Sequence, residues 1–316
     1  MTNEKTCKIV VVGSFIVDLS AITPAFPRDG ESIVGKRLKI GPGGKGSNQA
    51  TAASRAGGEV VMVTKTGNDT FRSVCTDHYA REQMTDKYVY SDPNEDTGTA
   101  IIEVHEKTAE NRIIVMKAAN DHLTPAEVDA AEEEFRTCDA VLLQLESNFD
   151  AIREAIALAK KYGKPIVMNP APAQKVPEGF FDGIDYFTPN ETEAEFFSGI
   201  VVKDEESAYA AGRKMIAEQN VGCVIITLGK KGAAVIMKDR AMVVPTTDLK
   251  PVDTTGAGDA FNGGLTVALA EKREIEDAVK FANCVASISV TRLGSSPAMP
   301  HRDEVEELYA RFYGKR

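Results

Sequence analysis

Five short apolar runs, each rich in β-branched or aliphatic residues, recur along the chain, and segments with helical patterning separate them. The runs are 8–14, 60–67, 140–146, 165–170 and 223–229. A run of this length that is apolar at nearly every position indicates a strand buried on both faces, as in a parallel sheet. Strands that alternate with helices predict an α/β fold in which helices cover both faces of a mostly parallel sheet.

Helix-capping signals support this alternation. The stretch TPAE at 124–127 is a capping box with proline at the first helical position, so a helix is expected to begin there. Asn148 and Asp204 are suited to cap helices at about 149–161 and 205–219. These helices fall between the apolar runs, as an α/β protein requires.

Two regions break the alternation. Residues 15–41 contain turn-like segments and strand-like pieces without a helical pattern, and residues 97–117 have the pattern of a β-hairpin. We expect these regions to pair as a small β-layer that projects from the main sheet and acts as a lid. Since the chain has no internal repeat and no linker, residues 1–316 are expected to form one domain with this appendage.

Composition argues against several kinds of partner and location. The net charge of -10 would repel nucleic acid and anionic membranes, and Lys and Arg are scattered among the acids. No segment has the length and apolarity of a membrane span. The five cysteines are dispersed and odd in number, which suits reduced thiols in a cytoplasm. A signal peptide is not expected, because Asp18 interrupts the first apolar run and no small-residue cleavage site follows.

The glycine-rich stretch GPGGKGSNQA at 41–50 partly matches two nucleotide-binding patterns. Its G-x-G-x-x-G spacing is that of a dinucleotide loop, but a long non-helical segment separates it from the first strand. A P-loop would need Ser or Thr directly after Lys45, where the chain has Gly46. Two interpretations remain open: a glycine turn that caps a helix starting near Ser47, or a loop that binds a polyol or an anion with Lys45 and Asn48.

The stretch PVDTTGAGDAFNGGL at 251–265 is the strongest chemical signal in the chain. Gly256, Ala257 and Gly258 form a flexible turn before a helix, and N–H groups there would form a hole for a transferring phosphoryl group. Asp259 at the mouth of this helix is kept ionised by the helix dipole and could accept a proton from an attacking alcohol. A helix cap is the alternative role for Asp259.

Together the two stretches resemble the ribokinase (phosphofructokinase-B) family of sugar kinases, and the likeness runs from Val10 to about Arg302. GGKGSNQA is similar to the family's N-terminal signature, and DTTGAGDAF is similar to its C-terminal one. The segments QLES, TPNETEAE, TLGKKG and SVTRLGSSP fit the same family. The resemblance implies a three-layer α-β-α ribokinase-like fold with a small β-sheet lid, and an ATP-dependent kinase that phosphorylates a sugar.

The resemblance also implies roles for individual residues. Asp259 would be the general base on the 5-hydroxyl of the sugar, and Gly256, Ala257 and Gly258 would form the anion hole. The residues expected to hold the sugar are Asp18, Gly43, Gly44, Lys45, Asn48 and Glu146, with Ile16 beside them. The residues expected to contact ATP are Asn190, Thr227, Gly229, Gly232, Gly258 and Asn283.

Metal ions and assembly follow from the same resemblance. Glu193 would organise Mg²⁺ through water. A monovalent cation, usually potassium, would be bound by Asp253 and by the carbonyls of Thr255, Ser289, Arg292 and Gly294. The lid of this family usually also makes a homodimer.

The residues themselves support only part of these assignments. Glu146 follows an apolar strand and should lie at its carboxyl end, where α/β proteins form ligand sites, although a solvated acid at a strand end is the alternative. Asn190 and Glu193 have the spacing of a capping box, which can coexist with a role in binding ATP and Mg²⁺. The segment 227–232 could be only a strand exit and a hairpin.

Two departures from the family pattern bear on the substrate and the cation. Ribokinases usually have Asn two residues before the sugar-binding Asp, where this chain has Ile16, and strand alternation puts Ile16 on the same face as Asp18. An isoleucine cannot bond a 2-hydroxyl, and a hydroxyl buried unpaired costs about 1–3 kcal/mol, so Ile16 favours 2-deoxyribose. Ala298 stands where the cation loop often has Ser, which removes one hydroxyl ligand.

We therefore predict a cytoplasmic kinase that converts D-ribose to D-ribose 5-phosphate. The alternative substrate is 2-deoxy-D-ribose, and other sugars or nucleosides follow. Two rival classes remain: a nicotinamide oxidoreductase, for which the loop at 41–46 is in the wrong place, and a non-catalytic sugar-binding protein. The presence of Asp259 and its glycine turn argues against the second rival.

Overall fold

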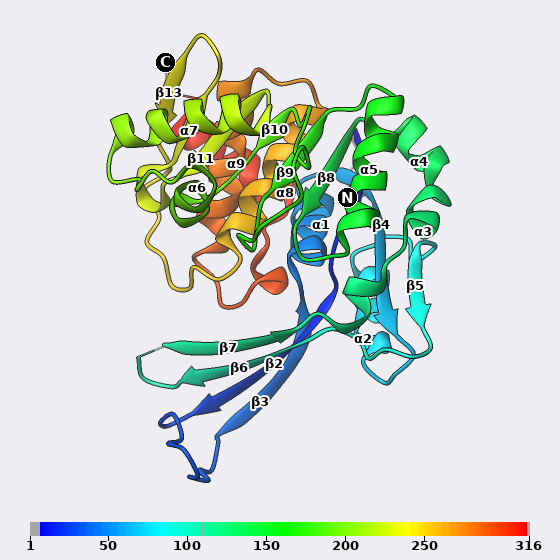
Figure 1. Ribbon diagram of the computed structural model, residues 1–316. Helices are drawn as coiled ribbons and strands as arrows, with labels where there is room; N and C mark the ends of the chain where they lie inside the picture. The colour runs from blue at the N-terminus through cyan, green and yellow to red at the C-terminus, as the bar shows by residue number, and fades with distance from the viewer. Residues whose placement is uncertain (1–6, 109, 315–316) are drawn as a thin grey trace.

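The computed structural model describes residues 7–108 and 110–314 (Figure 1). Within them nine strands form the main sheet: β1 (Cys7–Val12), β4 (Gly58–Gly67), β5 (Val89–Asp92), β8 (Ala140–Gln144), β9 (Ile166–Asn169), β10 (Tyr186–Phe187), β11 (Cys223–Thr227), β12 (Ala233–Ile236) and β13 (Ala241–Val244). Their order across the sheet is β13-β12-β11-β10-β9-β8-β1-β4-β5. The pairs from β5 to β11 are parallel, and β12 and β13 extend one edge in antiparallel fashion.

Helices cover both faces of this sheet and so create three layers. One face carries α1 (Lys45–Arg55), α2 (Arg72–Arg81), α8 (Ala257–Ala270), α9 (Ile275–Ser289) and α10 (Arg302–Phe312). The other carries α3 (Pro125–Asp129), α4 (Glu132–Thr137), α5 (Phe149–Lys161), α6 (Glu191–Ser198) and α7 (Glu205–Gln219). Side chains of β1 alternate between the two cores, with Ile9 in the first and Val10 in the second. Because both faces are buried, the strands are apolar at nearly every position.

The predicted three-layer α/β fold is confirmed, since all five apolar runs form strands of the main sheet. The capping signals also hold: α3 begins at Pro125 with Thr124 as its cap. The side chains of Asn148 and Asp204 accept backbone N–H groups at the starts of α5 and α7. The pattern did not predict that α3 ends at Asp129 and that α4 follows as a separate short helix.

The two regions that break the alternation form a second sheet, which projects from the main body (Figure 1). Among the described residues its strands are β2 (Ile16–Thr23), β3 (Arg37–Gly43), β6 (Thr99–His105) and β7 (Asn111–Met116), in the order β3-β2-β6-β7. β2 runs parallel to β6, and the two outer pairs are antiparallel. The expected small β-layer is therefore present, and its action as a lid stays a prediction.

One face of the small sheet has a row of apolar side chains, three of which are exposed, whereas the fourth, Leu19, is partly buried and packs against the first core. Four register partners, one from each strand, form this row: Ile40, Leu19, Ile101 and Ile114. Ile40 is 54% exposed, Ile101 43% and Ile114 62%. Asp18 precedes Leu19 on β2, so its side chain points to the opposite face. The apolar row therefore lies on the face of the sheet that turns away from Asp18.

One buried amide fastens the small sheet to the body. Asn120, in the short 3₁₀ helix η1 (Ala118–His122), accepts a hydrogen bond from Phe15 N (2.9 Å) and donates to Phe15 O (2.9 Å) and Lys117 O (2.8 Å). Phe15 directly precedes β2, and Lys117 directly follows β7. Gly98, which precedes β6, has no room for a side chain, because a Cβ there would lie 2.4 Å from Asn120 Nδ2. Asn120 thus joins three strands of the small sheet at their body ends.

The described part of the chain contains no helix that is both long and apolar enough to cross a membrane. All five cysteines are buried: Cys7, Cys75, Cys138, Cys223 and Cys284. Burial raises the pKa of the Cys138 thiol to about 11, and it raises the pKa of the Cys75, Cys223 and Cys284 thiols to about 12. These four thiols therefore stay protonated and unreactive at neutral pH.

Candidate active site

Charged side chains from distant parts of the chain meet at one edge of the main sheet. Asp18 lies on β2, Lys45 begins α1, Glu146 follows β8, and Asp259 lies in the first turn of α8. β1 and β8 are parallel neighbours, so their carboxyl ends share the edge where α/β proteins form ligand sites. Glu146 is 7% exposed and Asp259 is 8% exposed. The sequence predicted all four residues as site residues, and the fold brings them together.

Glu146, which follows β8, bonds to the segment between β1 and β2 and to the start of α1. Its Oε2 atom accepts a hydrogen bond from Ser14 Oγ (2.6 Å) and another from the backbone N of Lys45 (2.8 Å). The second bond satisfies one of the N–H groups at the start of α1 that have no partner within the helix. Gly44 is the N-cap residue of α1, which begins two residues earlier than the expected Ser47. The carboxylate therefore holds the glycine-rich loop against the end of β8.

Asp259 is held at both carboxylate oxygens. Asn48 Nδ2 donates to Oδ2 and Gln49 Nε2 donates to Oδ1, each at 3.0 Å. Asn48 Oδ1 in turn accepts from Ser296 Oγ (2.6 Å). Most of the Asn48 amide is thus committed to neighbouring groups, and one N–H is left for a ligand. Asp259 is not the N-cap of α8, because Gly256 occupies that position.

Mutual repulsion and burial perturb the acids of this cluster. Burial raises the pKa of Asp18 to about 7, and the charges of Glu146 and Asp259 add to the rise. Burial also raises the pKa of Asp259, against the lowering effect of Lys45 and of the two amide donors. Burial acts to lower the pKa of Lys45, but the charges of Asp259, Glu146 and Glu193 outweigh it, so the net shift is upward. Lys45 therefore remains a cation among several acids.

Ile16 and Asp18 occupy the same face of β2. Gly43 is the register partner of Ile16, and the Asp18 carboxylate lies directly over it, since a Cβ on Gly43 would come within 2.5 Å of the Asp18 side chain. Two residues apart on one strand, Ile16 and Asp18 point the same way. Ile16 is 2% exposed, so only a small part of its surface can meet a ligand beside Asp18.

Residues 256–258 form the start of α8, with Gly256 as its N-cap, and Gly258 faces open space. A Cβ on Gly258 would meet no heavy atom within 4 Å, so the backbone is accessible there. The first N–H groups of a helix have no partner within the helix and favour an anion. Ala257 N donates to Thr254 O (3.2 Å), so the Ala257 N–H group is directed back into the turn. Among the three residues of the expected anion hole, Gly258 is therefore the best placed.

The residues expected to contact ATP lie around the ends of β10 and β11. Asn190 and Glu193 form a capping box at the start of α6, as the alternative interpretation also predicted. Asn190 and Thr227 form an isolated bridge that places them side by side. Burial raises the pKa of Glu193, although the Asn190 hydrogen bond and Lys45 oppose the rise. Glu193 thus lies within electrostatic reach of Lys45 and Asp259.

Gly232 and Asn283 meet at the chain segment that follows β13. A Cβ on Gly232 would lie 2.1 Å from Val244 O. Asn283 Nδ2 donates to Val244 O (3.2 Å) and Pro245 O (3.3 Å). Gly229 begins the short 3₁₀ helix η2 (Gly229–Lys231), and its carbonyl accepts a hydrogen bond from Gly232 N (3.1 Å). Gly229, Gly232 and Asn283 therefore lie around one segment, although the Asn283 amide already donates to two carbonyls of that segment.

The loop expected to bind a monovalent cation is organised by Asp253. Its Oδ1 accepts from Thr255 N (3.0 Å) and its Oδ2 from Gly294 N (2.9 Å), which joins two loops. Burial acts to raise the pKa of Asp253, but the hydrogen bonds from Gly294 and Thr255 outweigh it and lower the pKa. Ser289 O accepts from Arg292 N (3.1 Å), and Ala298 is buried beside these loops. Among residues 7–108 and 110–314 no group of His, Cys, Asp and Glu side chains is placed to hold a metal ion, so any cation here would rely largely on carbonyls.

Several polar residues around the site were missed by the sequence analysis. They are buried amides and hydroxyls whose side chains hold the predicted residues in place: Ser14, Gln49, Asn120, Gln144, Asn169, Thr188 and Asn262. Gln49 directly follows Asn48, so its place at the start of α1 was a signal that could have been used. The others contact residues far away in the chain, and no local pattern marks them.

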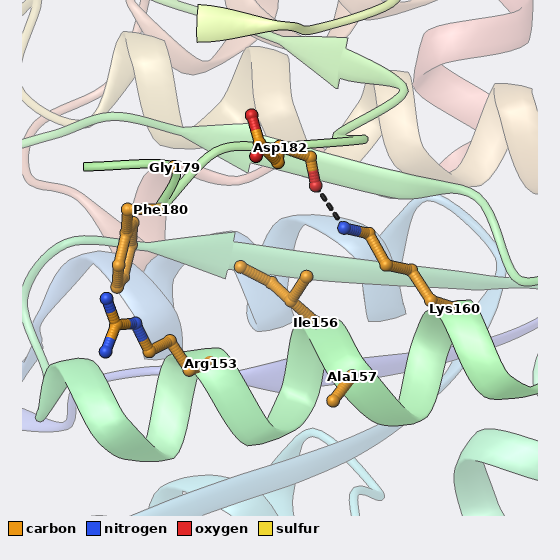
Figure 2. Close-up of a pocket in the computed structure, with 7 residues that line it drawn as sticks. All are labelled: Arg153, Ile156, Ala157, Lys160, Gly179, Phe180 and Asp182. Atoms are coloured by element: carbon orange, nitrogen blue, oxygen red, sulfur yellow. Dashed lines mark hydrogen bonds between the residues drawn. The ribbon is translucent and has the colours of Figure 1, made fainter. Parts of the chain in front are cut away.

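A surface pocket lies between α5 and the loop that follows residue 178 (Figure 2). Its lining residues are Arg153, Ile156, Ala157, Lys160, Gly179, Phe180 and Asp182. The Arg153 guanidinium lies 5.7 Å from the centre of the Phe180 ring, and Lys160 Nζ donates to Asp182 O. None of the predicted site residues lines this pocket, so it is separate from the candidate active site.

Comparison with known proteins gives consistent matches over nearly the whole chain. Residues 6–302 match the family model described as pfkB family carbohydrate kinase. A ribokinase of Haemophilus influenzae is 37% identical over 300 residues, which cover 95% of this chain and 97% of that protein. A deoxyribokinase of Salmonella typhi is 35% identical over 95% of this chain and 97% of its own length. A solved structure of Arabidopsis thaliana ribokinase complexed with ribose and ATP is 29% identical and has a TM-score of 0.89, covering 96% of this chain and 99% of that one.

Proposed function

The chain belongs to the pfkB family of carbohydrate kinases, and on this premise we propose that it transfers the γ-phosphoryl group of ATP to the 5-hydroxyl of D-ribose. The products are D-ribose 5-phosphate and ADP. Membership of the family itself implies that the chain is a phosphotransferase that acts on a sugar. The choice of ribose and ATP rests on the ribokinase of Haemophilus influenzae and on the Arabidopsis thaliana ribokinase complexed with ribose and ATP.

The single observation that carries the proposal is the position of Asp259. It is a buried carboxylate in the first turn of α8, beside the glycine turn, and amide donors hold both of its oxygens. A general base must be fixed within reach of the proton that it accepts. A phosphoryl group needs backbone N–H groups and a helix N-terminus close to it. The start of α8 offers both within one turn of helix.

In the proposed reaction Asp259 accepts the proton of the 5-hydroxyl as the oxygen attacks the γ-phosphorus. The O5–P bond forms while the bond between the γ-phosphorus and the ADP oxygen breaks, and the proton remains on Asp259. The N–H groups near Gly258 and the positive end of α8 stabilise the charge on the transferred group. Closure of the small sheet over the sugar would exclude water, which otherwise competes as the acceptor.

We assign the sugar to the space bounded by β2, α1 and the end of β8. Asp18 and Glu146 would accept hydrogen bonds from sugar hydroxyls, and Lys45 and the remaining N–H of Asn48 would donate. Gly43 and Gly44 would let the sugar approach the backbone closely. The ATP would lie across the ends of β10 and β11, near Asn190, Thr227, Gly229, Gly232 and Asn283.

A second candidate substrate is 2-deoxy-D-ribose. Ile16 shares a face with Asp18 and offers no hydrogen bond to a 2-hydroxyl, and the deoxyribokinase of Salmonella typhi is 35% identical. We rank ribose first, because the ribokinase of Haemophilus influenzae is 37% identical.

The residues present fit the expected ions. Mg²⁺ bound with ATP would neutralise phosphate charge, and Glu193 would hold it through water. Asp253 fits a monovalent cation, because its lowered pKa keeps it ionised and it joins two loops rich in carbonyls. The expected carbonyl ligands are those of Thr255, Ser289, Arg292 and Gly294.

We further propose a cytoplasmic homodimer formed through the small sheet. The apolar row of Ile40, Leu19, Ile101 and Ile114 is the support for the interface, since three of its side chains are exposed and exposed apolar patches are typical of protein contacts. The buried thiols support a reducing compartment. The net charge of -10 supports the absence of nucleic-acid and membrane partners.

A coupled assay of ADP release tests the function. The assay would compare ribose, 2-deoxyribose, other pentoses, hexoses and nucleosides, with and without potassium. We expect the highest kcat/KM with ribose, the next highest with 2-deoxyribose, and stimulation by potassium. A clear preference for a hexose or a nucleoside would overturn the substrate assignment. An absence of ADP release with every acceptor would favour a non-catalytic sugar-binding protein.

A further inference from the structure

We propose that Gln49 is a positioning residue for phosphoryl transfer, whose side-chain amide fixes the orientation of the Asp259 carboxylate toward the sugar hydroxyl. This inference rests on the proposed role of Asp259 as the base. Gln49 lies on α1, is fully buried and makes no direct approach to the sugar space, so it acts through Asp259.

Two neighbouring residues of α1 clamp the carboxylate. Gln49 Nε2 holds Oδ1 and Asn48 Nδ2 holds Oδ2, each at 3.0 Å. A carboxylate bonded at each oxygen cannot turn about its Cβ–Cγ bond without losing both contacts. Each oxygen still has a second lone pair, so the clamp leaves an acceptor position for the sugar hydroxyl.

The orientation of the Gln49 amide is set independently of Asp259. Thr188 O is a backbone carbonyl and can only accept, so Asn169 turns its Nδ2 toward it (2.9 Å). Asn169 Oδ1 therefore faces Gln49 and accepts from Gln49 Nε2 (3.0 Å). On the other side Gln49 Oε1 accepts from Gln144 Nε2 (2.8 Å). A flipped Gln49 amide would bring two acceptors together at both Asn169 and Asp259.

The same hydrogen-bond network extends to Gly258 at the start of α8. Thr188 Oγ1 donates to Asn262 Oδ1 (2.5 Å), and Asn262 Nδ2 donates to Gly258 O (2.8 Å). Gly258 directly precedes Asp259, so the network holds both the side chain of the base and the backbone beside it. The ring joins the ends of β8, β9 and β10 to the starts of α1 and α8. This arrangement gives the base one fixed orientation before any substrate arrives.

Loss of the Gln49 donor has a specific signature, because the hydrogen bond favours the ionised form of Asp259. The charged groups that face Asp259 are Lys45 on α1, Glu146 after β8, Asp18 on β2 and Glu193 on α6. All four remain in a Gln49 variant. Removal of the donor alone should therefore raise the pKa of the base and move the acidic limb of the kcat–pH profile to higher pH.

The test is Gln49→Leu, with Thr51→Val as the matched control. Thr51 is also fully buried on α1 and bonded to a side chain, but it has no contact with Asp259. For Gln49→Leu we expect kcat to fall about 10- to 100-fold, the acidic limb to shift up by about one pH unit, and the KM for the sugar to stay within about twofold. Thr51→Val should keep the kcat and the pH profile of the unaltered enzyme.

Unchanged kcat and an unchanged acidic limb in folded Gln49→Leu would overturn the inference. If Gln49→Leu does not fold, Gln144→Leu replaces it, because this variant keeps the contact between Gln49 and Asp259 but removes the donor to Gln49 Oε1. A smaller loss of kcat with the same direction of shift is expected there, and no change would overturn the inference. Asp259→Asn distinguishes a failure of the proposed base, Asp259, from a failure of the proposed positioning residue, Gln49. An active Asp259→Asn enzyme would overturn the assignment of the base, whereas an inactive one beside an unaffected Gln49 variant would overturn only the role of Gln49.

Discussion

Ile16 lies directly opposite Gly43 where β2 pairs with β3, and the Asp18 carboxylate covers the same glycine. An apolar side chain and an acid thus lie next to each other on β2, the strand that we propose to contact the sugar. The acid can accept hydrogen bonds from hydroxyls, whereas the isoleucine can only exclude water. The choice between ribose and 2-deoxyribose depends on how the 2-hydroxyl meets this pair.

Ile16→Asn should therefore shift the preference toward ribose. The new amide supplies a partner for the 2-hydroxyl, and the ratio of kcat/KM for ribose to that for 2-deoxyribose should rise by up to about a hundredfold. The measurement is a pair of steady-state titrations with each sugar. Ile22→Asn near the far end of β2 is a control that should leave the ratio alone. An unchanged ratio in Ile16→Asn would count against contact between Ile16 and the 2-hydroxyl.

Asp259→Asn should abolish turnover while sugar binding remains. The amide is nearly the same size as the carboxylate but cannot take up the proton, and loss of a general base typically costs about 10²–10⁴-fold in rate. ADP release measures the turnover, and calorimetry with the sugar measures the binding. Substantial turnover in this variant would show that another group accepts the proton.

Sugar affinity should weaken as the pH falls below about 7. The pKa of Asp18 is raised to about 7, so its carboxylate is ionised above that pH and protonated below it. Since the ionised form accepts sugar hydroxyls, KM should rise roughly tenfold per pH unit on the acidic side. Asp18→Asn should have a high KM that no longer changes between pH 5.5 and 8. A KM of the unaltered enzyme that is flat across this range would contradict the assignment.

His78 should make the fold sensitive to mild acid. Its Nε2 atom lies 2.9 Å from Thr51 Oγ1, and burial lowers its pKa from 6.5 to about 4. Thr51 donates its own proton to Ser47 O, so neutral His78 must donate through Nε2. Acid adds a second proton to the imidazole, at Nδ1. The unfolded chain takes up that proton at a higher pH than the folded chain does, so the free energy of unfolding should fall by up to about 3 kcal/mol as the pH drops from 6.5 to 4.

Urea unfolding at pH 7 and at pH 4.5 measures this effect. His78→Gln has no proton to take up, so its loss of stability between the two pH values should be smaller than that of the unaltered protein. Equal losses in both proteins would show that His78 does not carry the effect.

Ile114→Lys should dissociate the proposed homodimer. Ile114 is 62% exposed in the apolar row of the small sheet, and a buried lysine without a partner is costly at an interface. Sedimentation velocity would measure the mass in solution. Phe196→Lys is the control, because Phe196 is 48% exposed but lies on α6, outside the small sheet. A dimeric Ile114→Lys protein would exclude this face as the interface.

The sequence predicted best those features that depend on neighbouring residues. The cap residues Asn148 and Asp204 act on N–H groups two or three positions away, so the starts of their helices were predictable, and both helices also end at the expected residues. The strands were predictable for a similar reason, since burial on both faces requires a continuous apolar run. Asp259 and its glycine turn were recognisable because they form one short segment.

The features that the sequence did not predict depend on contacts between distant segments of the chain. Gln49 reaches Asp259 across 210 residues of chain, and Asn120 reaches Phe15 across 105. A buried amide in isolation has no pattern that separates it from a surface amide, because only the folded chain supplies its partners. The pairing of the two regions in one small sheet was expected, but the parallel direction of β2 and β6 was not, because local patterns describe each region separately.

The buried cysteines make this protein convenient for site-specific labelling. Since all five thiols are inaccessible, a cysteine introduced at Val34, which is 89% exposed between β2 and β3, would react selectively with a maleimide dye. The dye would sit on the connection between two strands of the small sheet. Its fluorescence would then test whether the small sheet moves toward the body when a sugar is added, and no native residue of the core would have to be replaced.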